Sequence, residues 1–147
     1  MLTPEFTRLQ YTAGSRQLEQ VSPDAWILDQ YFLNRPGNEA IQIELQYDYR
    51  NNPPLYPEWQ AYMREYQPPT LVVWGKNDIL FTTAGALAYE RHLDDLELHL
   101  LNTGHFALEE ECHLIANLIR QFFSSRGLLL WEQRALEEFT YSAVEAW

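Results

Sequence analysis

The stretch TLVVWGKND, residues 70–78, decides the fold. It begins with a continuous apolar run that is rich in β-branched residues and that stops at Gly75. Short apolar runs of this kind are typical of strands that are buried on both faces of a parallel sheet. The sequence therefore predicts a buried strand whose carboxyl end is followed by Asp78.

The residues after this strand predict a βαβ unit. TAGALAYERHL, residues 83–93, is predicted to be helical, and residues 97–101 form a second short strand. A crossover of this type is right-handed and lays its two strands parallel, so both carboxyl ends reach the same edge of the sheet. His105 follows the second strand, within NTGHFALEEE, residues 102–111. We therefore expect Asp78 and His105 at one edge.

Such a placement permits an interacting pair. Neighbouring strands lie about 4.8 Å apart, so short loops can bring a carboxylate to an imidazole nitrogen. An aspartate in this position fixes the tautomer of the histidine and stabilises the imidazolium that forms when the ring accepts a proton. From the spacing alone, a structural and a catalytic role for Asp78 and His105 both stay open.

Further helices are predicted on either side of the βαβ unit. Ser22-Pro23-Asp24 is a helix-start signal, and the helix should run to about Asn34. Aromatic and apolar residues from Pro57 to Tyr66 recur at helical spacing and are followed by Pro68-Pro69. The same spacing predicts a helix over residues 107–123, with an apolar stripe made of Leu108, Cys112, Ile115, Ile119 and Phe122.

Two segments are less clear. Residues 40–49 alternate apolar and polar side chains as a strand does, but their Ala, Gln, Glu and Leu content favours a helix. Residues 1–21 are polar and lack sustained periodicity, with a loop or turn at Ala13-Gly14-Ser15.

Composition restricts the partners. The chain has 147 residues and a formal net charge of −11, which disfavours binding to nucleic acid and to anionic membranes. No signal peptide or membrane span is recognisable, so we expect a cytoplasmic protein. The one cysteine, Cys112, lies on the predicted stripe and is expected to be a small core residue. Glu109 and His113 are a weak metal signal, and we predict neither a metal nor a cofactor.

WGKND, ILF, GALAY and LLNTGHFALEE together resemble the carboxyl-terminal half of capped α/β-hydrolases, the superfamily that includes haloalkane dehalogenases, epoxide hydrolases and esterases. SPDAWILDQYFLNRPG, QYDYRNN and YPEWQAYMREYQPP resemble the helical cap of these enzymes, and the resemblance covers about residues 10–123. It favours a helix over residues 40–49. It also implies that Asp78 is the acid and His105 the histidine of a nucleophile–acid–histidine triad.

The resemblance implies a partial α/β-hydrolase fold with its amino-terminal strands missing. Residues 1–69 would be the helical cap region, residues 70–123 the carboxyl-terminal part of the core, and residues 124–147 an unassigned helical tail. No G-x-S-x-G nucleophile elbow occurs in the sequence, and the loop that completes an oxyanion hole is absent as well.

Two functional hypotheses follow. In the first, the chain supplies the acid and histidine of a hydrolase that acts on a small ester, epoxide or haloalkane once an amino-terminal half completes it. In the second, it is a catalytically inert, truncated protein that serves as a structural or partner-binding module, with self-association as one form of partnership. The tyrosines of the predicted cap are expected to be packing residues.

Overall fold

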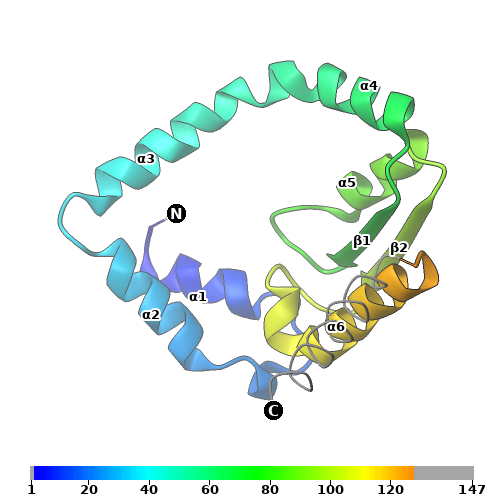
Figure 1. Ribbon diagram of the computed structural model, residues 1–147. Coiled ribbons are helices and arrows are strands. Elements are labelled where there is room, and N and C mark those ends of the chain that lie inside the picture. The colour runs from blue at the N-terminus through cyan, green and yellow to red at the C-terminus, as the bar shows by residue number, and fades with distance from the viewer. Residues whose placement is uncertain (1, 128–147) are drawn as a thin grey trace, which may run out of the picture. The chain divides into compact units, whose positions relative to one another are not determined.

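The computed structural model describes residues 2–127 of the chain (Figure 1). It divides into two compact units, of which the first ends at Cys112 and the second begins at His113. The elements in chain order are α1 (Pro4–Thr12), η1 (Leu18–Gln20), α2 (Pro23–Leu33), α3 (Asn38–Asp48), η2 (Tyr49–Asn51), η3 (Pro53–Leu55), α4 (Tyr56–Tyr66), β1 (Thr70–Gly75), α5 (Thr83–Leu87), η4 (Ala88–Arg91), β2 (Leu96–Leu101) and α6 (Ala107–Ser125). Most of the predicted tail, from residue 128 on, lies outside the described residues.

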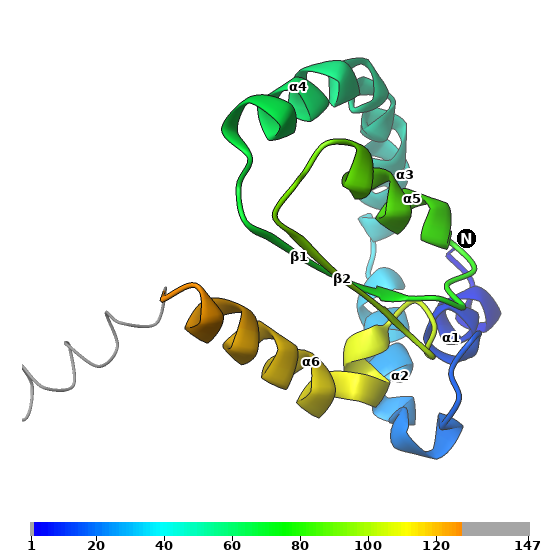
Figure 2. The ribbon, with the colours of Figure 1, turned by 90° about the vertical axis from the view of Figure 1, so that its right-hand side faces the viewer.

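The predicted βαβ unit is confirmed. Strands β1 and β2 pair in parallel, with Thr70 opposite Leu96 and Gly75 opposite Leu101, and α5 packs on β1 (Figure 2). The connection is less regular than predicted, because the α-helix ends at Leu87 and a 3₁₀ turn carries the chain to Arg91. Within residues 2–127 the sheet contains these two strands.

Helix α1 is the element that the sequence analysis missed. Its cap repeats the signal that correctly predicted α2: the hydroxyl of Thr3 accepts a hydrogen bond from the Phe6 N–H, and Pro4 occupies the first turn. Helix α1 packs against α2, and a buried hydrogen bond of 2.7 Å from the Thr7 hydroxyl to the side-chain oxygen of Gln30 joins them. The cap formed by Thr3 and Pro4 is the signal that would have indicated this helix.

Residues 40–48 of the ambiguous segment lie in helix α3, as the resemblance favours, and Tyr49 begins η2. Successive residues of a helix are separated by about 100°, so positions two apart fall on nearly opposite sides of the axis. The alternating apolar residues therefore cannot form one buried face. Ile41, Ile43, Leu45 and Tyr47 are 57%, 56%, 59% and 62% exposed, and α3 has no buried residue.

Helix α6 corrects the predicted apolar stripe. Glu111 leaves the helical backbone region, with φ −122° and ψ 26°. Residues before and after it therefore do not follow one helical repeat, and their side chains do not form one continuous face. Leu108 and Cys112 are exposed, as is Ile119, so Cys112 is not a core residue. The buried positions of α6 after the kink are Ile115, Leu118 and Phe122.

A search of residues 2–127 for a helix with the length and hydropathy of a membrane span finds none.

Candidate active site

The loops that follow β1 and β2 are held side by side. Beyond the ends of the strands, the Lys76 N–H donates to the Leu101 carbonyl at 2.9 Å and the Asn77 N–H donates to the Thr103 carbonyl at 3.1 Å. Gly75 makes this approach possible, because a Cβ atom at this position would overlap the Gly104 carbonyl oxygen. The two loops are therefore fixed to each other along their first residues.

Asp78 is oriented by its own turn. One carboxylate oxygen, Oδ1, accepts hydrogen bonds from the backbone N–H groups of Leu80 at 2.7 Å and Phe81 at 3.0 Å. The other oxygen, Oδ2, lies 2.9 Å from Nδ1 of His105. Burial raises the pKa of the Asp78 carboxyl, but the hydrogen bonds from Phe81, His105 and Leu80 outweigh burial and lower the pKa overall. The group is thus held as a carboxylate facing the imidazole.

His105 is partly enclosed. Its side chain is 17% exposed, and its ring contacts the ring of Phe81, with centroids 5.3 Å apart, and the ring of Phe106, with centroids 4.9 Å apart. The Asp78 contact uses Nδ1, so a hydrogen on Nδ1 places the lone pair of the neutral ring on Nε2. In this tautomer Nε2 is the nitrogen that can accept a proton.

The structure thus brings together Asp78 and His105, as the sequence predicts. It also places an aromatic layer, made of Tyr11 and Phe106, beside His105, and this layer was not predicted. The ring of Tyr11 stacks on the ring of Phe106 at a centroid distance of 4.0 Å, and its hydroxyl donates to Asp29 at 2.5 Å. Burial, then the hydrogen bond to Asp29, raises the pKa of Tyr11. Tyr11 was not selected from the sequence because it lies on α1, which was not predicted. The cap formed by Thr3 and Pro4 was the signal that could have indicated this helix.

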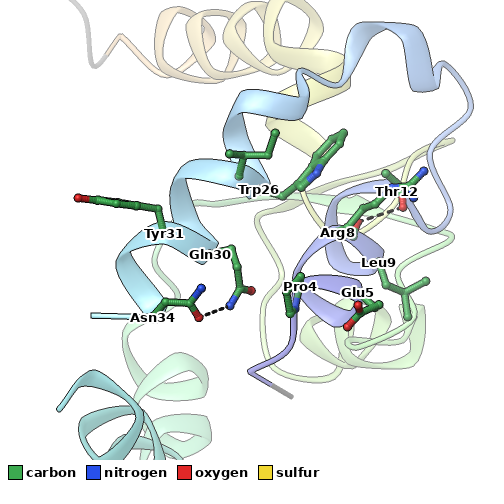
Figure 3. Close-up of a pocket in the computed structure, with 10 residues that line it drawn as sticks. Pro4, Glu5, Arg8, Leu9, Thr12, Trp26, Gln30, Tyr31 and Asn34 are labelled. Atoms are coloured by element: carbon green, nitrogen blue, oxygen red, sulfur yellow. Dashed lines mark hydrogen bonds between the residues drawn. The ribbon is translucent and has the colours of Figure 1, made fainter. Parts of the chain in front are cut away.

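A pocket of about 650 Å³ lies against this layer and is lined by Tyr11, Asp29, Ile43 and Phe106, among other residues. A larger pocket of about 710 Å³ lies between α1 and α2 (Figure 3). In Figure 3 the side chains of Arg8, Trp26 and Gln30 border this larger space. Neither Asp78 nor His105 lines it, so its size does not make it the candidate site.

Glu109 and His113, the weak metal signal of the sequence, both lie on α6. Residues 2–127 contain no group of three or more His, Cys, Asp or Glu side chains placed to hold an ion. The weak signal of Glu109 and His113 therefore finds no third ligand there.

Comparison with known proteins explains the arrangement. No family model matches the chain. An uncharacterized hydrolase of Saccharomyces cerevisiae is 43% identical over 115 residues, which is 78% of this chain and 40% of the yeast protein. A 2-hydroxy-6-oxononadienedioate/2-hydroxy-6-oxononatrienedioate hydrolase of Pseudomonas putida is 32% identical over 72 residues, or 48% of this chain and 25% of that protein.

A solved structure agrees with these relatives. The crystal structure of a serine hydrolase involved in carbazole degradation matches 84% of this chain and 48% of that chain, with a TM-score of 0.55 and 23% identity. The resemblance of the chain to the α/β-hydrolase superfamily is borne out. The predicted partial α/β-hydrolase fold is confirmed by this likeness, which at 23% identity speaks for the fold.

The chain spans less than half the length of the curated relatives it matches, 40% of the yeast protein and 25% of the Pseudomonas protein. The serines within residues 2–127 are Ser15, Ser22, Ser124 and Ser125. None of them lies in the loops after β1 or β2, Ser22 caps α2, and the hydroxyl of Ser125 donates to the Phe122 carbonyl at 3.0 Å. The pair of Asp78 and His105 is therefore present in this part of the hydrolase fold without a recognisable nucleophile elbow.

Proposed function

We propose that the chain supplies the acid and the histidine of a nucleophile–acid–histidine triad in an α/β-hydrolase. The observation that carries this proposal is the 2.9 Å contact between Asp78 Oδ2 and His105 Nδ1 at the carboxyl ends of the two parallel strands. In α/β folds, reacting groups sit in the crevice beyond the carboxyl ends of the strands. Asp78 would orient the ring, and His105 would carry the proton.

The chemistry of such a site balances in two steps. When the nucleophile is a serine, its hydroxyl proton passes to Nε2 of His105 as the oxygen attacks the carbonyl carbon of an ester, and the imidazolium then returns the proton to the leaving alkoxide. Water repeats the cycle and releases the acid. When the nucleophile is an aspartate, its oxygen displaces halide as the free anion or opens an epoxide, whose alkoxide takes a proton from solvent. His105 then takes a proton from the water that attacks the ester intermediate and returns it to the alkoxide that leaves.

The substrate class depends on the nucleophile, so we propose a small organic ester, epoxide or haloalkane. The nucleophile and the oxyanion hole would come from an amino-terminal half of the hydrolase, and residues 1–69 would act as its cap. Two features support completion by another part: the described sheet has two strands, and apolar residues of α3 such as Ile41 and Leu45 are more than half exposed. Exposed apolar surface of this kind marks interaction sites.

The test is a chimera. Residues of this chain that align with the yeast hydrolase replace the corresponding 115 residues of that protein, and the product is assayed for ester hydrolysis, epoxide opening and halide release. We expect turnover of one substrate class. His105→Gln and Asp78→Asn should each lower kcat by about 10³-fold or more with the fold retained.

His113→Gln serves as the matched control, since His113 is an exposed histidine of α6, eight positions after His105. Its kcat should equal that of the unchanged chimera. A folded chimera that turns over substrate equally well with and without His105 would refute the proposed triad.

A catalytically inert, partner-binding module is the second candidate. The exposed apolar residues of α3 favour it, because they would serve a partner whether or not catalysis occurs. It predicts that the chain forms a stable dimer or a stable complex with the amino-terminal part of the yeast hydrolase, as measured by analytical ultracentrifugation, while every chimera stays inactive.

A further inference from the structure

Glu110 is a buried carboxylate that the proposed triad does not use. It lies in the first turn of α6, directly before the kink at Glu111, and only 6% of it is exposed. Burial of an ionised carboxylate is costly unless hydrogen bonds compensate it. The identity of its donors therefore shows what the residue holds in place.

The donors come from two distant segments. One carboxylate oxygen, Oε1, accepts from the backbone N–H groups of Arg16 at 2.8 Å and Gln17 at 2.5 Å. The other oxygen, Oε2, accepts from the hydroxyl of Thr103 at 2.5 Å. Glu110 thus joins residues 13–17, which we call the connector because they link α1 to η1, to the loop that carries His105.

The connector lies directly against the candidate site. The carbonyl of Gly14 accepts a hydrogen bond of 2.9 Å from the Asn77 side chain, next to Asp78. A Cβ atom on Gly104, next to His105, would overlap the carbonyl oxygen of Ala13. Positions beside both members of the pair are therefore in contact with the connector that Glu110 holds.

Thr103 is the link between Glu110 and the pair. Its side chain is fixed by Glu110, and its carbonyl accepts the Asn77 N–H from the loop of Asp78. Thr103 is 1% exposed and stands two residues before His105. If the Thr103 hydroxyl lost its hydrogen bond to Glu110, the two loops would be held together less firmly. The imidazole of His105 would then be held less firmly against the carboxylate of Asp78.

We propose that Glu110 is a positioning residue for the proposed hydrolase site: through Thr103 and the connector it holds the His105 loop in the arrangement that keeps Nδ1 on Asp78. The inference rests on the proposed function for its catalytic meaning. The effect of Glu110 on the contact between His105 and Asp78 is a property of this chain alone, and it can be measured without an assay of turnover.

The first experiment uses proton NMR on the unmodified chain and its variants. The Nδ1 proton shared by His105 and Asp78 gives a resonance far downfield, and its exchange with water reports how persistently the pair is formed. Thr103→Val removes the hydroxyl, Thr103→Ser restores it, and Glu110→Gln removes the charge. Glu109→Gln is the matched control, because the neighbouring Glu109 is exposed and would lose the same charge.

We expect Thr103→Val and Glu110→Gln to speed this exchange by about tenfold, equivalent to about 1.4 kcal/mol in the closing equilibrium of the pair. Thr103→Ser and Glu109→Gln should match the unchanged chain. Far-UV circular dichroism establishes that each variant is folded, and if Thr103→Val does not fold, Glu110→Gln and Thr103→Ser decide the result. Unchanged exchange in folded Glu110→Gln, whatever its stability, would overturn the proposal.

The second experiment separates this inference from the proposed function. In an active chimera, Thr103→Val should lower kcat by about tenfold or more with KM little changed, because a small misplacement of a reacting group lowers the rate strongly. An inactive chimera combined with faster exchange in the chain supports the positioning role and contradicts the hydrolase. An active chimera whose kcat does not respond to Thr103→Val or Glu110→Gln contradicts the positioning role and leaves the hydrolase standing.

Discussion

The ring of Tyr11 stacks on the ring of Phe106, with 4.0 Å between the centroids and 15° between the planes. Phe106 in turn contacts the imidazole of His105 edge to face. Helix α1 therefore supplies a wall of the candidate site, although its residues stand far from His105 in the sequence. Several measurable consequences depend on this wall and on the loops behind it.

Tyr11→Phe should lower the free energy of unfolding by about 1 kcal/mol, because the hydroxyl loses its hydrogen bond to Asp29 while the exposed carboxylate regains water. The stacked ring is retained, so the fold should persist. Urea unfolding followed by tryptophan fluorescence measures the change. Tyr31→Phe is the control, since Tyr31 is 67% exposed and should behave as the unchanged chain. Equal stability of both variants would contradict the role of the Tyr11 hydroxyl.

Gly104→Ala should destabilise the chain by about 2 kcal/mol or more, because its new methyl group would overlap the Ala13 carbonyl oxygen. Gly85→Ala tests the same substitution in helix α5, where the nearest atom would lie 4.0 Å away. It should leave stability unchanged or raise it by up to about 1 kcal/mol. Thermal unfolding of the two variants compares them directly. A harmless Gly104→Ala would show that the connector does not lie against the His105 loop.

Acid should unfold the chain through Asp78 and Glu110. In Glu110, burial raises the pKa, but the hydrogen bonds from Thr103, Gln17 and Arg16 outweigh it, and the pKa of Asp78 is lowered in the same way. Folding therefore favours both ionised forms. The stability they contribute is fully present above their ordinary pKa values of 3.8 and 4.5 and is lost as pH falls through the lower values of the folded chain.

Glu110→Gln removes one of these two contributions. The urea midpoint of this variant should vary less between about pH 5 and pH 3 than that of the unchanged chain. Glu109→Gln should retain the full dependence, as Glu109 is exposed. A variant of Glu110 with the same acid dependence as the unchanged chain would show that its carboxylate is not held ionised by the fold.

The thiol of Cys112 should react with iodoacetamide in the folded chain, since the residue is exposed. The rate should lie within about tenfold of that of an unfolded peptide thiol at the same pH. Mass spectrometry over time measures it. If the thiol did not react at all in the folded chain, Cys112 would be a core residue, and the kink at Glu111 would be contradicted.

The strands and the candidate pair were predictable because each rests on local sequence. The apolar run before Gly75 predicts a buried strand by itself, and the handedness of a βαβ crossover places Asp78 and His105 at one edge. Helix α3 needed the resemblance, since alternating apolar residues cannot form one helix face. Helix α1 could have been found from Thr3 and Pro4, which repeat the helix-start signal of Ser22 and Pro23.

The role of Glu110 could not be predicted from the sequence. It stands in a run of three glutamates at the start of a helix, where acidic residues are favoured by the helix dipole and usually face solvent. Only the fold shows that Arg16 and Gln17 approach it. The apolar stripe of α6 was predicted at the wrong positions for a related reason. Glutamate is a common residue inside helices, so its presence at position 111 does not indicate a break.

The hydrogen bonds of Glu110 to Arg16 and Gln17 span 94 and 93 positions, and that of Asn77 to Gly14 spans 63. The pairing of β1 with β2 closes a far shorter loop. Since the entropic cost of closure rises with loop length, and folding slows as contacts become less local, the βαβ unit should form early and the connector should dock last. The geometry around His105 would then be among the final features to appear during refolding and the first to be lost in partial unfolding.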